Sequence, residues 1–249
     1  MKNFIKNYYD LNKIDTKTYY DEFSKIYEAK RDRGYHKMID NLEVSILSKY
    51  LNKTDIVLEV GCGTGLLLKE VDKLVSKAIG IDLSDKMLEK AKERGLEVYQ
   101  AEASNLPFGD NYFDVVYSYK VLAHIEAVEK TLQEINRVLK PGGFAVLEFY
   151  NRNSLRTLLK KIKPKNIISG SITDESVYTR YDTLKEIRYY LPKSLKIKAV
   201  KGIRIITPAF FVYNIPVVKD IFYNSEFLLK DTVFSKLGGF LVVIAQKDF

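Results

Sequence analysis

The chain has 249 residues, of which 46% are hydrophobic and 29% charged, so its composition is that of a globular protein with a sizeable core, not of a disordered chain. The single cysteine, Cys62, excludes a disulfide framework within the chain and a cysteine-rich metal centre. With only two histidines a His-rich metal centre is not expected either, so we expect no metal ion. The net charge is +8. The sequence shows no apolar run of the kind found in signal peptides or membrane-spanning helices, so we expect a cytoplasmic protein.

The amino-terminal residues 1–52 predict a helical segment that precedes the core. Apolar residues recur at helical spacing at Tyr19, Tyr20, Phe23, Ile26 and Tyr27, and a second apolar stripe runs through residues 35–50. Gly34 separates the two stripes, so we expect two helices here.

Residues 53–150 alternate between strand and helix patterns. Short apolar runs predict strands at 56–60, 77–82, 96–101, 113–119 and 144–150. Apolar residues at helical spacing predict three helices: one after the glycine cluster at 61–65, one after the N-cap candidate Ser84, and one that begins near residue 127. The run Lys140-Pro141-Gly142-Gly143 is a stop signal for the last of these helices. Such alternation predicts an α/β fold with a parallel sheet covered on both faces, whose ligands bind at the carboxyl edge of the strands.

From residue 151 onward, strand and helix patterns no longer alternate regularly. Residues 154–162 and 183–191 predict helices, and residues 195–206 and 239–247 predict strands. Residues 151–237 form an expected cap that includes the sixth strand, and 238–249 carry the last core strand. Residues 151–230 hold 16 Lys+Arg against 6 Asp+Glu, so the basic excess of the chain is concentrated in this segment. It is either a solvated surface or a surface that attracts an anionic partner.

The loop Gly61-Cys62-Gly63-Thr64-Gly65 lies between a predicted strand and a predicted helix. It lacks the GxxxxGK[ST] pattern of a phosphate loop, and Leu66 stands where a dinucleotide fingerprint requires its third glycine. A tight turn alone could explain the glycines. Asp82, however, ends the next strand, where its carboxylate can accept hydrogen bonds from both hydroxyls of a ribose; the alternative is an acid favoured by a helix N-terminus.

Five ordered segments carry a resemblance to a known family. VLEVGCGTG, GIDLS, AEASNLPF, FDVVYS with LAHI, and INRVLKPGGFAVLE resemble the class I S-adenosylmethionine-dependent methyltransferases, in the small-molecule branch of the ubiquinone/menaquinone-biosynthesis enzymes. The resemblance is strong over residues 17–150. It implies a Rossmann-like, mostly parallel sheet of seven strands with an antiparallel last strand, helices on both faces, and a helical, aromatic cap. Residues 53–150 are then the S-adenosylmethionine-binding core, and residues 1–52 form its lid.

The resemblance also implies roles for individual residues. Gly61 and Gly63 would contact the methionine part of S-adenosylmethionine, Glu59 would steer its ammonium group, and Asp82 would bind the ribose. Residues around the adenine and the methionine would be Leu83, Met87, Glu102, Ala103, Ser104, Ser118 and Tyr119, and Tyr27 would close over the donor from the lid. The family usually has Asp at the position of Glu59, and Ser104 departs from its usual Asp-Ala-Glu.

Methyl transfer from a sulfonium requires alignment and exclusion of water more than acid catalysis, and a base only if the acceptor loses a proton. His124, Glu148 and Tyr20 are the candidate catalytic residues; the alternative for His124 is a packing or helix-capping role, which the resemblance also implies at this place. We expect a small, amphiphilic or anionic acceptor, with peripheral membrane contact as a minor possibility. The alternatives are an RNA or protein methyltransferase, an NAD-type oxidoreductase and a non-catalytic nucleoside-binding protein. The oligomeric state does not follow from the sequence.

Overall fold

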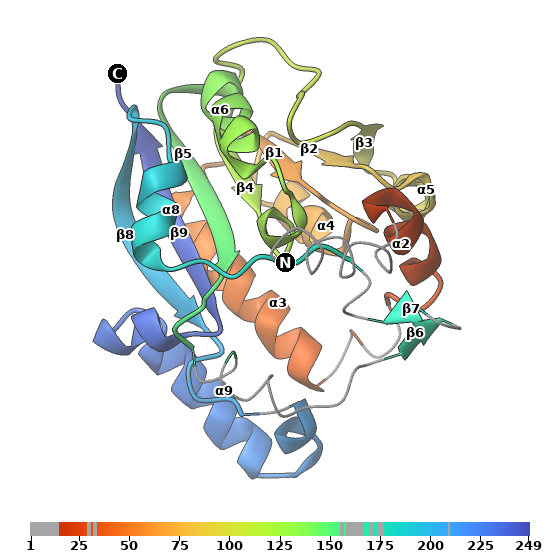
Figure 1. The fold of residues 1–249 in the computed structure, drawn as a ribbon, viewed down its shortest axis with the longest axis vertical. Helices are drawn as coiled ribbons and strands as arrows, with labels where there is room; N and C mark the ends of the chain where they lie inside the picture. The colour runs from red at the N-terminus through yellow and green to blue at the C-terminus, as the bar shows by residue number, and fades with distance from the viewer. Residues whose placement is uncertain are drawn as a thin grey trace, which may run out of the picture.

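Seven strands form one sheet in the order β3-β2-β1-β4-β5-β9-β8. The computed structural model describes residues 15–28, 31, 34–154, 157, 167–169, 172–173, 177–208 and 210–249. The strands of the sheet are β1 (Ile56–Val60), β2 (Lys77–Asp82), β3 (Glu97–Gln100), β4 (Phe113–Ser118), β5 (Leu139–Tyr150), β8 (Leu195–Ile203) and β9 (Phe240–Lys247). Figure 1 shows this sheet with the helices packed around it.

The first five strands run parallel, as the alternating pattern predicts. β1 pairs with β2 and β4, β2 pairs with β3, and β4 pairs with β5, all in parallel register. Apolar side chains of β1 and β4 are buried on both faces, which is typical of strands covered by helices on both sides. All five strands therefore end at the same edge, and the loops that follow β1, β2 and β4 meet there.

The last strand, β9, runs antiparallel between β5 and β8, which confirms the expected topology. β5 is longer than the predicted strand 144–150. It begins at Leu139 and includes the run Lys140–Gly143, because Leu139 pairs with Phe113 before an irregularity shifts the register. The stop signal thus ends the helix at Val138 but does not delay the strand.

Two hydrophobic cores cover the faces of the sheet. One contains buried residues of α3 (Gly34–Leu47), α4 (Leu66–Asp72) and α5 (Asp85–Glu93), and the other contains buried residues of α6 (Val128–Val138) and α8 (Leu184–Tyr190). α8 confirms the helix predicted at 183–191, and Thr183 begins it with a capping box. The helix predicted at 154–162 lies almost entirely outside the described residues.

The remaining elements lie in the segments predicted as lid and cap, except one 3-10 helix that follows β4. They are α2 (Thr16–Phe23), the short 3-10 helices η1 (Ser48–Tyr50), η2 (Leu122–His124), η3 (Phe210–Asn214) and η4 (Val233–Leu237), α9 (Val218–Leu229), and the paired strands β6 (Ile167–Ser169) and β7 (Ile172–Thr173). β6 contacts α2, so part of the cap meets the lid. Within the described ranges, no helix combines the length and apolar character needed to cross a bilayer.

The aromatic run 210–227 contributes mainly to packing and to the surface. Tyr213 is buried, and Phe222, Tyr223 and Phe227 pack against the core that contains α3. Phe210 and Phe211 are exposed instead. The aromatic residues of this run are therefore divided between the core and the surface.

Candidate functional site

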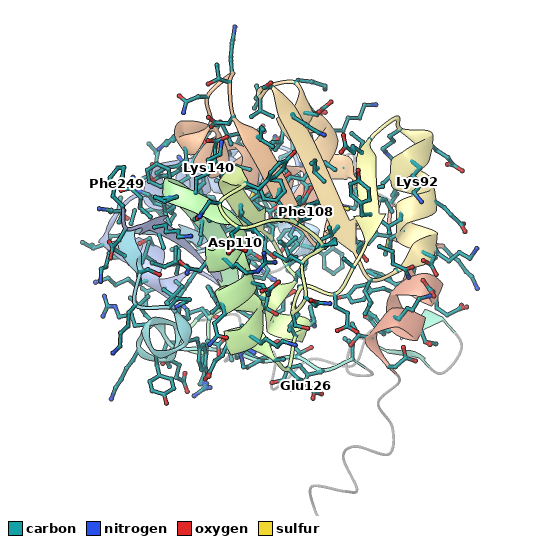
Figure 2. All side chains as sticks on the ribbon, turned by 90° about the horizontal axis from the view of Figure 1, so that it is seen from above. Lys92, Phe108, Asp110, Glu126, Lys140 and Phe249 are labelled. Atoms are coloured by element: carbon teal, nitrogen blue, oxygen red, sulfur yellow. The ribbon has the colours of Figure 1, made fainter. Side chains whose placement is uncertain are left out.

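A cavity of about 810 Å³ opens at the carboxyl edge of the parallel strands. This volume is near the upper end of small-molecule sites, which span roughly 300–1,000 Å³. The lid, the loops after β1, β2 and β4, and the segment 177–181 of the cap all contribute to its walls. In Figure 2, Glu126 of this cavity lies at the lower side of the view, far from Lys140 near the start of β5.

The glycine loop forms one wall of the cavity, and its backbone there lies close to the side chain of Val121. Gly61 and Gly63 line the cavity with φ angles of 79° and 54°, values that favour glycine. A Cβ on Gly61 would lie 2.2 Å from Cγ2 of Val121, and one on Gly63 would lie 3.9 Å from the Tyr27 ring. The backbone N–H groups of Gly61 and Cys62 donate to the carbonyl of Ile81, each at 2.8 Å. The loop is thereby fixed to the end of β2.

Asp82 lines the cavity beside this loop. Its carboxylate accepts hydrogen bonds from the backbone N–H groups of Gly63, at 2.8 Å, and Ser84, at 2.9 Å. Burial raises the pKa of the Asp82 carboxyl above its ordinary value, and these backbone bonds oppose that rise. The two bonds fix the carboxylate while leaving it lone pairs that can accept from a ligand.

The wall next to Asp82 contains the other residues that the sequence predicts around the adenine. Leu83, Met87, Glu102, Ala103 and Ser104 all line the cavity. The Ser84 hydroxyl caps α5 by accepting from the Met87 N–H at 3.2 Å, which fixes Met87 at the first turn of that helix. The hydroxyl of Ser104 donates to Glu102 at 3.3 Å.

The segment predicted as a lid forms another wall of the cavity. Tyr20 and Tyr27 both line it, and burial raises the pKa of each phenol. The lid is joined to α5 by polar contacts: Asp21 accepts from the Ser84 hydroxyl, and Arg94 donates two bonds of 2.8 Å to Glu28. These contacts hold the lid over the glycine loop.

Two cations at the glycine-loop end of the cavity were not found by sequence reasoning. Arg31 lies 4.6 Å from the Tyr27 ring centroid and pairs with Asp40 at 2.7 Å, and Lys120 pairs with Asp40 and Glu43. Both cations line the cavity, and Nε of Arg31 is buried without a hydrogen-bond partner among the described residues. Although burial opposes it, the two carboxylates raise the pKa of Lys120 and keep it charged.

Lys120 could have been noticed, because it directly follows the fourth strand, where ligand-binding loops of such folds lie. Its φ of 62° is uncommon for a residue with a side chain. Arg31 lies in a polar stretch between two helices, and no local pattern distinguishes it from a surface arginine.

An aromatic chamber forms the opposite part of the cavity. Tyr20, His124, Tyr150 and Tyr181 line it, and the His124 ring lies 6.2 Å from the Tyr20 ring and 5.5 Å from the Tyr150 ring. Nδ1 of His124 is 2.8 Å from the carbonyl oxygen of Tyr178, so Nδ1 carries a hydrogen and donates it. In the neutral ring, Nε2 is then an acceptor, and the Tyr150 hydroxyl lies 3.4 Å from it.

Comparisons with known proteins agree with this geometry. Residues 58–147 match the model of a methyltransferase domain. The uncharacterized protein MJ1252 of Methanocaldococcus jannaschii is 32% identical over 203 residues, which cover 75% of this chain and 78% of that protein. A ubiquinone/menaquinone biosynthesis C-methyltransferase of Francisella tularensis subsp. novicida is 34% identical over 172 residues, which cover 58% of this chain and 69% of that protein.

A solved structure from Thermotoga maritima, described as an S-adenosylmethionine-dependent methyltransferase and possible histamine N-methyltransferase, superposes with a TM-score of 0.68. It shares 23% identity and covers 94% of this chain and 100% of its own, which shows the fold. The chain belongs to the S-adenosylmethionine-dependent methyltransferases. Its co-substrate is S-adenosylmethionine, and an NAD-type oxidoreductase is no longer an alternative.

The site fits this co-substrate of the methyltransferases. Gly63 leaves open the space that a Cβ would fill below the Tyr27 ring, Asp82 presents a fixed carboxylate, and the buried Nε of Arg31 has no hydrogen-bond acceptor among the described residues. These features suit a nucleoside with a zwitterionic amino-acid tail, because the sugar needs acceptors and the tail carboxylate needs donors.

Three residues that the sequence predicts in this methyltransferase site do not line the cavity. Glu59 is buried below the glycine loop, where it accepts from the Tyr117 hydroxyl at 3.0 Å, and burial raises its pKa well above the ordinary value. The Ser118 hydroxyl donates to the carbonyl of Val60 at 2.9 Å. Glu148 is buried on β5 and is not among the residues that line the cavity, whereas Tyr119 is.

Proposed function

We propose that this methyltransferase transfers a methyl group to a small, largely apolar acceptor that carries one ionisable O–H, N–H or acidic C–H group. The observation that carries the proposal is the continuity of one cavity from the glycine loop and Asp82 to the aromatic chamber around His124. The chamber is lined by Tyr20, Tyr150 and Tyr181 with Val177 and Phe240, a composition that suits an aromatic or amphiphilic molecule.

S-adenosylmethionine supplies an activated methyl group on a positively charged sulfur. In the proposed arrangement, Asp82 holds the ribose, and Arg31 and Lys120 face the carboxylate of the amino-acid end. Tyr27 covers the glycine loop, and Tyr20 closes the space between the two halves of the cavity. These residues align the reactants and exclude water, which supplies most of what an in-line displacement requires.

His124 is the proposed base. Because Nδ1 donates to the Tyr178 carbonyl, Nε2 can accept the proton that the acceptor loses when it gains the methyl group. The Tyr150 hydroxyl, 3.4 Å from Nε2, can relay that proton or orient the acceptor. Tyr20 is the other polar group of the chamber, and it remains a candidate contact to the acceptor.

The basic excess of residues 151–230 gives this proposal little support. The cavity-lining residues of the described part of that segment are Val177, Thr179 and Tyr181, all of them neutral. We therefore base the acceptor class on the aromatic lining of the chamber.

The test is transfer of a radioactive methyl group from S-adenosylmethionine to separate pools of phenols, hydroquinones, fatty acids, amines, total RNA and protein lysate. We expect label in the organic extract of a small-molecule pool. His124→Gln should lower turnover about 100-fold or more while leaving S-adenosylhomocysteine affinity unchanged. The matched control is His36→Gln, which changes the exposed histidine at the other end of the cavity. Label recovered only in RNA or protein would contradict the acceptor class, and normal turnover of His124→Gln would remove the base.

A further inference from the structure

A short segment of the cap connects the two elements that carry His124 and Tyr150. We call residues 178–182 the strap. The carbonyl of Tyr178 accepts from Nδ1 of His124 at 2.8 Å, and the backbone N–H of Asp182 donates to the carbonyl of Tyr150 at 2.8 Å. The strap therefore lies against η2 at one end and against the end of β5 at the other.

The side chain of Arg180, in the middle of the strap, holds η2 on both sides of His124 in the chain. Nη1 of Arg180 donates to the carbonyl of Ile125 at 2.9 Å, and Nη2 donates to the carbonyl of Leu122 at 3.2 Å. The backbone N–H of Arg180 donates to the carbonyl of Ala123 at 2.7 Å. Carbonyls at the end of a short helix lack partners within the helix, and the planar fork of a guanidinium can donate to several of them at once. Arg180 thereby fixes the backbone that carries His124.

Asp182 fixes this guanidinium in turn. Its two carboxylate oxygens lie 2.8 and 3.0 Å from Nε of Arg180, which donates to them, and Asp182 is fully buried. Besides its N–H bond to the Tyr150 carbonyl, the backbone of Asp182 accepts from the N–H of Arg152 at 3.0 Å. The ion pair of Arg180 and Asp182 thus joins η2 to the end of β5.

This ion pair acts on the site only through other residues. Neither Arg180 nor Asp182 is among the described residues that line the cavity, whereas their neighbours Thr179 and Tyr181 are. Burying two charges costs hydration free energy that their attraction largely offsets, so such a pair adds little net stability to a fold. What the pair provides is a fixed geometry, because a buried carboxylate that loses its partner is strongly destabilising.

That geometry decides which ring nitrogen of His124 carries the hydrogen. Nδ1 donates to the Tyr178 carbonyl only while η2 and the strap keep their relative positions. The hydroxyl of Thr179 lies 3.3 Å from the same nitrogen. If the carbonyl moves away, this hydroxyl can donate to Nδ1, and the hydrogen of the neutral ring is then on Nε2. In that form Nε2 is no longer an acceptor toward the Tyr150 hydroxyl.

We propose that Arg180 and Asp182 are positioning residues for the methyl transfer, which keep the hydrogen of the His124 ring on Nδ1 and leave Nε2 to accept a proton. This inference rests on the proposed role of His124 as the base. The form of the ring is measured without turnover, however, so the two proposals can fail separately.

The test is nitrogen-15 NMR of the histidine rings in the full chain with S-adenosylhomocysteine bound, at a pH at which the rings are neutral. The chain has two histidines, so the spectrum of His36→Gln assigns the signals of His124. We expect the hydrogen on Nδ1 in the original chain. Arg180→Met keeps the apolar stem but removes the donors, and it should give a mixture of the two ring forms. It should also lower transfer to the labelled small-molecule pool about tenfold or more, at an unchanged KM for S-adenosylmethionine.

The matched control is Arg137→Met. Like Arg180, Arg137 donates to two backbone carbonyls and pairs with carboxylates, here those of Glu134 and Asp110, but these partners lie outside η2 and the strap. The control should lower stability in urea and leave the hydrogen of His124 on Nδ1. A merely structural role of Arg180 would make the two variants behave alike.

Arg180→Lys is the second variant, because Arg180→Met leaves the buried carboxylate of Asp182 without its partner. The lysine keeps a positive charge beside Asp182 but cannot donate to both carbonyls of η2, so it should fold and still give the mixture of ring forms. A hydrogen on Nε2 in the original chain, or one that stays on Nδ1 in the folded Arg180 variants, would overturn the positioning role even if His124→Gln is inactive. Normal turnover of His124→Gln would instead contradict the base, and with it the catalytic role of the pair, whatever the ring form.

Discussion

Removal of the Asp82 carboxylate tests the cofactor site most directly. In the proposed site this carboxylate receives two hydroxyl donors of the ribose, in addition to the backbone N–H groups of Gly63 and Ser84. A hydrogen bond to a charged group contributes about 1.5–3 kcal/mol, so Asp82→Ala should lose about 3 kcal/mol or more of binding free energy, roughly a hundredfold in Kd. Asp82→Asn keeps one acceptor oxygen, so its Kd should lie between that of the original chain and that of Asp82→Ala.

Calorimetry with S-adenosylhomocysteine measures this loss without turnover. Because the variant also removes the acceptor of two backbone N–H groups, its unfolding in urea should be measured in parallel. The matched control is Asp85→Ala, which removes an acid next to Asp82 in the chain that does not line the cavity and pairs with Lys17. We expect its Kd to stay unchanged. A folded Asp82→Ala that binds as tightly as the control would refute the reasoning.

Three further predictions concern the lid, the glycine loop and a surface carboxylate. Arg94→Met removes both bonds to Glu28 and should speed S-adenosylhomocysteine dissociation in stopped flow; an unchanged rate would show that this pair does not hold the lid. Gly61→Ala places a methyl group 2.2 Å from Val121 and should cost about 1–3 kcal/mol of unfolding free energy in urea, so equal stability would contradict the close approach. Although burial opposes it, lysine neighbours lower the pKa of Asp231 to about 2. A lowered carboxyl pKa stabilises the fold above the unfolded pKa, and this stabilisation is lost as pH falls through the folded value of about 2. Asp231→Asn should therefore cost about 1 kcal/mol or less at neutral pH and much less at pH 2 in urea titrations, and an equal cost at both pH values would contradict this pKa.

For the base candidates, the sequence specifies the position in the chain but not access to the cavity. Sequence reasoning placed Glu148 near the carboxyl end of a strand and His124 after another strand, and both positions are correct as chain positions. In β5, however, side chains alternate, and Glu148 is buried one step below Tyr150, whose ring reaches the cavity. The sequence does not reveal how far along the strand the cavity extends. It therefore could not show that the side chain of Glu148 is outside the cavity lining and that of His124 is part of it.

The pattern of residues alone predicted the parallel sheet, the glycine loop and the position of Asp82 at the sheet edge, because these features depend on hydrophobic period, on glycine at left-handed φ and on strand ends. The antiparallel last strand was implied by the resemblance of the sequence to the methyltransferase family, since no local pattern specifies the direction of a strand. Only the tertiary structure showed that Arg31, Lys120 and Tyr150 share the cavity, and that the basic cap segment contributes Val177, Thr179 and Tyr181 to its described lining. The physical reason is that a cavity is made by contacts between segments distant in the chain, and neither periodicity nor charge counts specify which side chains of those segments meet.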